Sequence, residues 1–227
     1  MHVALLAPIA WRTPPRHYGP WERVVALLAE GLVDLGVEVT LFATADSHVE
    51  GARLEAVVPA PYEEDPDVDA QVWIGLHVSN CLRQAGRFDL VHSHLDFFPL
   101  PFSPFAEAPL LTTIHGFSSE RILPAYRAFD DATYYAAISD ADRHPALHYA
   151  ATVYHGIDLP AFTFREAPGD YLLFFGRFHP DKGPDAAIRV AREAGMPLVM
   201  AGVVQDRAYF EREVEPHLDG ERVRYVG

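Results

Sequence analysis

Two patterns meet in residues 174–185, which read FFGRFHPDKGPD. The apolar run at 171–175 predicts a buried strand, and Gly176 marks its end. A few residues later, Gly183-Pro184 begins a helical pattern. The stretch therefore predicts a strand-to-helix connection of the kind that builds a parallel α/β sheet.

Arg177 and Lys182 fall in or beside this predicted loop, at the carboxyl end of the strand. Open α/β sheets bind ligands at that edge. A guanidinium, an ammonium and the positive end of a helix suit a diphosphate. Two solvated surface charges on a loop are the plain alternative, and the spacing alone does not separate the two interpretations.

The composition excludes several classes of protein. The chain has 227 residues, 49% hydrophobic and 22% charged, as is ordinary for a globular protein. A net charge of −14 argues against nucleic acid as a partner, because basic surfaces bind phosphate backbones. Cys81 is the single cysteine, so no internal disulfide is possible. No apolar run approaches the roughly 18 residues of a transmembrane segment, and residues 1–7 do not resemble a signal peptide. We therefore expect a cytoplasmic protein.

The first part of the chain alternates predicted strands with predicted helices. A strand at 3–7 is followed by a proline-rich aromatic loop and by a helix from Trp21 that stops at Gly36. Further strands are expected at 37–43, within 52–69, and at 89–92, 110–114, 133–138 and 152–154. Further helices are expected at 68–85, capped by Gly86, and from Ser118 or Ser119 to about Phe129. The run at 95–105 is broken by prolines and predicts a packed loop.

A second α/β run follows a proline-containing linker. Its strands are expected at 171–175, 198–201 and 222–226, and its helices at about 184–194 and 207–218. Three strands and two helices are few for an independent domain. We expect an N-terminal domain at 1–158, a linker at 159–169 and a partial C-terminal domain at 170–227.

Six motifs, in order along the chain, resemble those of retaining glycosyltransferases of family 4, which have the GT-B fold. They are APIAWRTPP at 7–15 with YGPWERVV at 18–25, VHSH at 91–94, TTIHG at 112–116, AIS at 137–139, VYHGID at 153–158, and FGR at 175–177 with DKG at 181–183. The first is similar to a branch that includes the avilamycin glycosyltransferase. The resemblance covers essentially the whole chain. It implies an α/β, GT-B type fold: a Rossmann-like acceptor-binding domain with a parallel sheet, then the beginning of a second Rossmann-like domain that binds a nucleotide sugar.

Two departures from the family pattern bear on function. The family usually has two glycines in the first loop, where this chain has Gly19-Pro20. The family's second domain also continues well beyond Gly227 and supplies a glutamate-rich motif that no part of this sequence matches. The resemblance therefore leaves open a fragment of a longer enzyme and a truncated product.

The resemblance implies roles for particular residues. The donor-binding residues are Gly19, Gly176, Arg177 and Lys182; the acceptor-binding residues are Trp11, Tyr18, His115 and Ser139; the catalytic residues are His115, Arg177 and Lys182. Each has a structural alternative. Gly19 could serve only a tight turn, His115 could be a satisfied structural histidine, Ser139 could cap a helix, and Trp11 and Tyr18 could cover the core.

Several other residues are assigned structural roles. His92 and His94 alternate along a strand end and are expected to point to opposite faces, so at most one could face a shared cleft. His94 with Asp96 fits no common zinc spacing. Glu22 favours the helix dipole, with catalysis as the weaker interpretation, and Cys81 is expected to be a small buried hydrophobe.

The function implied by the resemblance is transfer of a sugar from a UDP- or GDP-sugar to an acceptor hydroxyl, with retention and without a metal ion or cofactor. Arg177 and Lys182 would neutralise the leaving diphosphate. A non-catalytic or truncated acceptor-binding fragment is the alternative. A nicotinamide-dependent enzyme is disfavoured, because no Gly-x-Gly-x-x-Gly follows the first strand. The expected partners are a nucleotide sugar and a small-molecule or glycan acceptor, with homo-oligomerisation left open.

Overall fold

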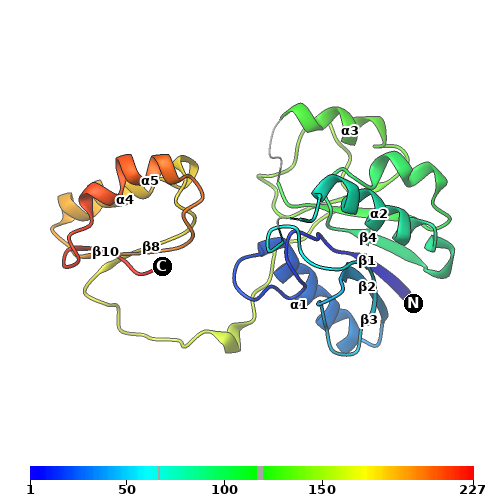
Figure 1. Ribbon diagram of the computed structural model, residues 1–227, viewed down its shortest axis with the longest axis horizontal. Coiled ribbons are helices and arrows are strands. Elements are labelled where there is room, and N and C mark those ends of the chain that lie inside the picture. Colours follow the sequence, from blue (N-terminus) through cyan, green and yellow to red (C-terminus); the bar gives the residue numbers. More distant parts are fainter. Residues whose placement is uncertain (66, 117–119) are drawn as a thin grey trace. The chain divides into compact units, whose positions relative to one another are not determined.

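The computed structural model describes residues 1–65, 67–116 and 120–227. The chain forms two compact units, Met1–Leu159 and Pro160–Gly227, and Figure 1 shows the elements of each. We describe each unit by itself.

Unit 1 is built on a parallel sheet of seven strands, in the order β3-β2-β1-β4-β5-β6-β7. The strands are β1 (His2–Leu6), β2 (Glu38–Thr44), β3 (Arg53–Val58), β4 (Leu90–Ser93), β5 (Leu110–Ile114), β6 (Tyr134–Ala137) and β7 (Ala151–Thr152). The α-helices are α1 (Pro20–Asp34), α2 (Ala70–Leu82) and α3 (Leu123–Ala128). This is the expected Rossmann-like arrangement.

Both faces of this sheet are covered, and β1 shows why. Val3 and Leu5 pack in one cluster with Val25 and Ala29 of α1. Ala4 and Leu6, which alternate with them, pack in a second cluster with residues of α2 and α3. Figure 1 shows α1 on one side of the sheet and α2 on the other. The continuous apolar run at 3–7 thus reflects burial on two faces.

Unit 2 has a parallel sheet of three strands in the order β10-β9-β8. Its elements are β8 (Leu172–Phe175), α4 (Pro184–Ala194), β9 (Leu198–Ala201), α5 (Arg207–Glu213) and β10 (Val223–Tyr225). Both helices pack into a single cluster on one face of the sheet, with Phe178 and Met200 at its centre (Figure 1). The steady strand order explains this, because successive right-handed crossovers in one direction place their helices on one face.

The expectation that residues 171–175 form a fully buried strand was wrong. Leu172 and Phe174 pack against the cluster beneath α4 and α5, but Leu173 is 61% exposed and Phe175 is 82% exposed. An apolar run predicts a strand, but it does not tell whether a second layer covers the other face.

Several element boundaries also differ from the expectations. Gly86 does not cap α2, because the helix ends at Leu82 and Gly86 lies inside a short 3-10 turn, η1 (Ala85–Arg87). The proline-rich run at 95–105 includes the 3-10 helix η2 (Leu100–Phe105). The last predicted helix is shorter, since α5 ends at Glu213 and a 3-10 turn, η6 (Glu215–His217), follows. Ser118 and Ser119 lie outside the described residues, and the next elements are η3 (Glu120–Ile122) and α3.

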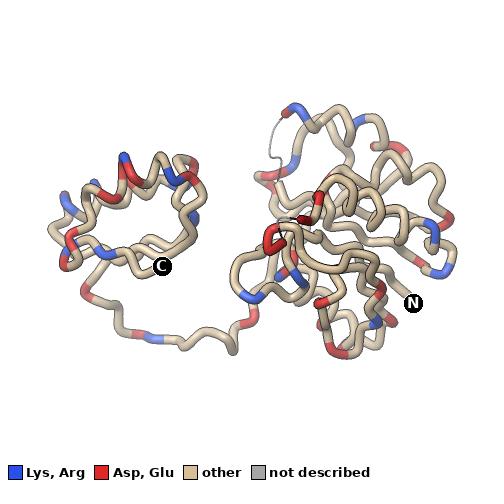
Figure 2. The backbone as a smooth tube through the Cα atoms, viewed as in Figure 1, with Lys and Arg blue, Asp and Glu red and all other residues tan. Residues whose placement is uncertain are grey.

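The linker and loop regions hold two further 3-10 turns, η4 (Leu159–Ala161) and η5 (Pro180–Lys182). Basic and acidic residues are interspersed along both units (Figure 2). Among the helices of the described residues, none combines the length and hydropathy needed to cross a bilayer.

Candidate functional site

The strand order of unit 1 reverses between β1 and β4, which are neighbours in the sheet but not in sequence. Parallel sheets bind ligands in the crevice outside the carboxyl ends of the strands at such a switch point. The loop after β1, residues 7–19, and the end of β4 at His94 both lie at this edge. The ends of β5 and β6 lead to His115 and Ser139 at the same edge. The topology thus collects all the predicted unit 1 site residues on one edge of the sheet.

Gly19 and Glu22 fix the conformation of the first loop where it meets the N-terminus of α1. Gly19 has φ of 148°, and a Cβ there would lie 2.7 Å from Cβ of Pro15. Both observations favour glycine. The Trp11 backbone N–H donates a hydrogen bond to Oε1 of Glu22 across 3.1 Å. The rings of Trp11 and Tyr18 meet edge to face at 6.4 Å between centroids. The tight-turn interpretation of Gly19 is thus met, and its donor role remains a prediction.

Glu22 is buried, with 2% of its surface exposed, although it lies in the first turn of α1. Burial raises the pKa of this carboxyl to about 7, against the lowering effects of its hydrogen bonds to its own backbone and to Trp11. Across the described residues, no cationic group contributes to the shift. Glu22 therefore does more than favour the helix dipole: it anchors the first loop through a carboxyl that titrates near neutral pH.

Four histidines form a continuous cluster at the edge of the sheet, and this corrects the expectation for His92 and His94. The ring centroids of His92 and His94 are 4.4 Å apart, so these two side chains share one side of the sheet. The expectation was wrong because residues i and i+2 of a strand line the same face of the sheet, and the backbone N–H of His94 continues the ladder to β1. Nδ1 of His94 is 2.9 Å from Nε2 of His115, and Nδ1 of His115 is 3.3 Å from Nε2 of His155.

Trp21 completes the surroundings of His115. Its ring stacks on the imidazole at 5.1 Å between centroids, with 19° between the planes. Trp11 and Tyr18, which are expected to bind the acceptor, pair with each other, whereas Trp21 stacks on His115. His92 donates to or accepts from Oγ1 of Thr113 across 2.8 Å.

The four imidazoles are held in their neutral form. Burial, with smaller contributions from the neighbouring His155 and His92, lowers the pKa of His115 to about 3. Burial lowers the pKa of His92 to about 4 and that of His94 well below its ordinary value. The pKa of His155 is also lowered, mainly by burial. At neutral pH this cluster offers hydrogen bonds without positive charge.

Ser139 lies at the end of β6 and is half-buried. Its hydroxyl accepts a hydrogen bond from the Asp142 backbone N–H across 3.1 Å and lies 3.0 Å from Oδ2 of Asp142. It therefore stabilises a turn rather than a helix. The acceptor-binding role of Ser139 remains a prediction.

In unit 2, Arg177 and Lys182 lie between β8 and α4, as expected. The Arg177 guanidinium donates to Oε1 of Gln205, a neutral partner. Lys182 ends η5 and is exposed, and its ammonium group has no ion-pair or hydrogen-bond partner within residues 1–65, 67–116 and 120–227. Gly183, with φ of 63°, follows it and caps the N-terminus of α4. Neither cation is neutralised by a carboxylate in the described structure, which leaves both available to an anion.

Gly176 lies where two strand ends approach closely. A Cβ at Gly202, which has φ of 140°, would overlap the carbonyl oxygen of Gly176. The backbone N–H of Gly176 donates to the carbonyl oxygen of Ala201 across 3.0 Å. These contacts fix the start of the loop that carries Arg177.

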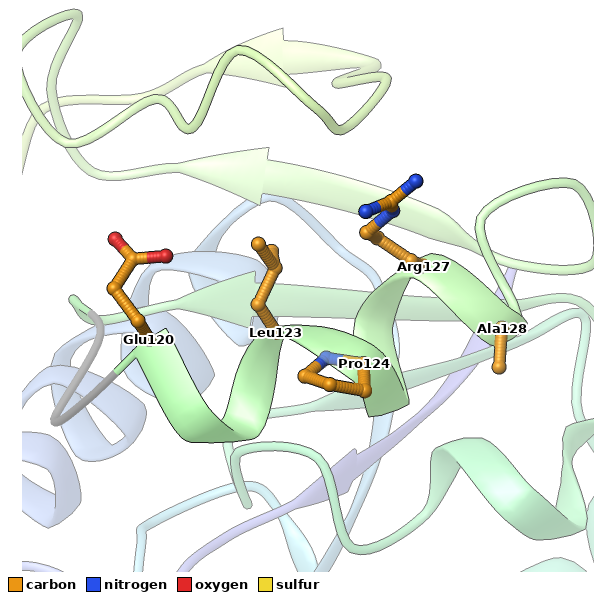
Figure 3. A pocket seen from close by; sticks show the side chains of 5 residues that line it. All are labelled: Glu120, Leu123, Pro124, Arg127 and Ala128. Carbon is orange, nitrogen blue, oxygen red and sulfur yellow. The ribbon is translucent and has the colours of Figure 1, made fainter.

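The pocket elsewhere in unit 1 and the single cysteine add no functional site. A pocket on η3 and α3 is lined by Glu120, Leu123, Pro124, Arg127 and Ala128 (Figure 3), none of which is a predicted site residue. In the parts of the chain that the structure describes, no group of three or more histidine, cysteine or acidic residues could hold a metal ion. Cys81 is buried and free as expected, and burial raises its pKa to about 12.

A family model described as Glycosyltransferase Family 4 matches residues 21–159, more than half of the chain. The chain belongs to glycosyltransferase family 4. The match contains α1 from its second residue, the histidine cluster and Ser139, so the switch-point edge apart from the first loop lies inside it. A search of curated proteins found no match.

Several solved structures share the fold of this family 4 chain. AviGT4, a glycosyltransferase involved in avilamycin A biosynthesis, is 27% identical with a TM-score of 0.66. The alignment covers 100% of this chain and 64% of that one. Sucrose-phosphate synthase from Thermosynechococcus elongatus is 17% identical with a TM-score of 0.71, over 100% of this chain and 70% of that one. Anabaena Alr3699/HepE, solved in complex with UDP, is 16% identical with a TM-score of 0.64, over 100% and 69%. These neighbours confirm the GT-B type fold expected from the sequence.

Proposed function

We propose that the chain takes part in the transfer of a sugar from a nucleotide-diphosphate sugar to an acceptor hydroxyl. The transfer retains the anomeric configuration and uses no metal ion. Membership of glycosyltransferase family 4 supports sugar transfer. The observation that carries the proposal is the pair of cationic side chains at the carboxyl end of β8: the Arg177 guanidinium has only a neutral partner, and the Lys182 ammonium has none in the described residues.

The diphosphate is proposed to bind Arg177, Lys182 and the backbone around Gly176. Negative charge on the diphosphate grows as the bond to the sugar breaks, so fixed cations stabilise the transition state more than the ground state. The N-terminus of α4, capped by Gly183, follows Lys182, and the positive end of its dipole favours an anion. Gly19, at the N-terminus of α1, is assigned to the donor as well.

The acceptor is proposed to bind at the switch-point edge of unit 1. Trp11 and Tyr18 would offer aromatic faces to a sugar or another small molecule, and Ser139 a hydroxyl. His115 is a neutral hydrogen-bonding group for a sugar hydroxyl at the reacting centre. No nucleophile is assigned, and front-face attack by the acceptor hydroxyl fits this set of groups.

The second candidate is a non-catalytic acceptor-binding role. It is favoured by the sheet of unit 2, whose Leu173 and Phe175 are exposed on the face away from α4 and α5. A cytoplasmic location, a UDP- or GDP-linked donor and homo-oligomerisation remain predictions.

The test is release of UDP from UDP-glucose, or of GDP from GDP-mannose, by the wild type and by Arg177→Ala and Lys182→Ala. Each variant is expected to lose at least ~10²-fold in rate, the scale of losing one charge-stabilising donor. Arg189→Ala is the matched control, because Arg189 lies on α4 and pairs with Asp185 at 2.6 Å. Full activity in both test variants would refute the role of the pair.

A further inference from the structure

We propose that His94 is a positioning residue that fixes the orientation and the tautomer of His115. His94 is fully inside the protein, 1% exposed, at the end of β4. Its backbone N–H donates to the carbonyl oxygen of Leu6 across 2.9 Å, which ties it to β1 at the switch point. Its ring therefore sits on the rigid part of the sheet.

Both ring nitrogens of His115 are engaged in the structure. Nε2 faces Nδ1 of His94 at 2.9 Å, and Nδ1 faces Nε2 of His155 at 3.3 Å. Stacking on Trp21 restrains the plane of the ring. The two histidine neighbours of His115 differ, since His94 is buried and His155 lies on an exposed segment. A ligand can replace His155 but cannot reach the nitrogen that His94 holds.

The three rings must share one tautomer when they are neutral. A neutral imidazole carries one proton, so each nitrogen pair needs one donor and one acceptor. If His94 carries its proton on Nδ1, then Nε2 of His115 accepts and Nδ1 of His115 is the donor toward His155. If His94 carries its proton on Nε2, then His115 and His155 must also carry theirs on Nε2, and Nδ1 of His115 becomes the acceptor. The buried ring thus decides whether His115 presents a donor or an acceptor at its outer nitrogen.

Within the described residues, the far ring nitrogen of His94 makes no competing hydrogen bond. Nε2 of His94 is buried and has no hydrogen-bond partner among the described residues. The low pKa values of the cluster keep the rings neutral at pH 7, which the coupling requires. Only the catalytic consequence of this coupling rests on the proposed function of His115.

The experiment is long-range ¹H–¹⁵N spectroscopy of the ¹⁵N-labelled histidines in the 227-residue chain at pH 7. In the wild type, His94, His115 and His155 are expected to carry the proton on the same ring nitrogen. In His94→Phe, His115 is expected to lose its fixed tautomer, so that the shifts of its two nitrogens move toward each other. His94→Asn, whose amide can occupy the place of Nδ1, is expected to restore the wild-type pattern.

His92→Gln is the matched control, because His92 lies against His94 but belongs to no nitrogen pair of the line. It is expected to leave the His115 shifts unchanged. Protons on different nitrogens in the three wild-type rings, or the wild-type His115 pattern in a folded His94→Phe, would overturn the inference. The readout involves no sugar, so a failure of donor binding in the same protein would count against the proposed function alone.

Discussion

The two parallel sheets differ in what covers them. In unit 1 the strand order reverses between β1 and β4, so helices lie on both faces and the four consecutive side chains of residues 3–6 in β1 are all buried. In unit 2 the order runs in one direction, both helices share a face, and the other face exposes Leu173 and Phe175. Sheets made wholly of parallel strands are normally covered on both sides. The comparison shows that one reversal of strand order places helices on the second face of the sheet and also creates the switch point at which a ligand can bind.

The largest expected effect separates the two faces of unit 2. Phe178 is fully buried in the cluster with α4 and α5, whereas Phe175 is 82% exposed. Phe178→Ala is expected to cost about 3–5 kcal/mol of stability, and Phe175→Ala less than about 0.5 kcal/mol. Hydrogen exchange of the β9 amides measures this, since all three tryptophans lie in unit 1. Equal costs would show that the second face is covered in solution.

A smaller effect on stability is expected at Glu22, where the first loop of unit 1 meets α1. Burial raises the pKa of Glu22 from 4.5 to about 7, so protonation favours the folded state. This contribution is present in full below pH 4.5, falls as the pH rises to about 7, and amounts to about 3 kcal/mol. Glu22→Gln should therefore gain stability relative to the wild type between pH 5 and 8, as measured by urea unfolding with tryptophan fluorescence.

The control for Glu22 is Glu30→Gln, which removes an exposed carboxylate from the same helix. Its difference from the wild type should stay constant over that range of pH. If Glu22→Gln shows the same constant difference, the carboxyl is not buried as the structure places it.

The smallest effect on stability is expected on the uncovered face of unit 2. Leu173→Lys should change the free energy of unfolding by no more than about 0.5 kcal/mol, while it reduces binding of a hydrophobic dye. Leu172→Lys, one residue earlier and packed against the cluster, is the matched comparison and should unfold the unit. Unchanged dye binding in Leu173→Lys would mean that this face is not the exposed apolar surface.

The strands were predictable because burial on two faces leaves a continuous apolar run. The runs at 110–114 and 198–201 match β5 and β9 in full. The same reasoning failed at residues 171–175, because composition does not reveal whether a second layer exists. The positions of His92 and His94 were mispredicted because residues i and i+2 of a strand share a face, and their rings do lie 4.4 Å apart.

The contacts among site residues were less predictable, because they depend on how the strand ends meet. The pairing of His94 with His115 and the stacking of Trp21 join segments far apart in sequence. Glu22 did carry a signal: it falls on the buried stripe of α1 with Val25, Ala26 and Ala29, at helical spacing. A carboxylate on an apolar stripe is worth examining for a raised pKa.

The most direct measurement is calorimetric titration of UDP-glucose into the wild type, the Arg177→Ala/Lys182→Ala double variant and Arg189→Ala. The account predicts a heat of binding in the wild type and in Arg189→Ala, and its loss in the double variant. Equal binding by all three proteins would contradict the assignment of the diphosphate to the loop between β8 and α4. No binding by the wild type would favour the non-catalytic role.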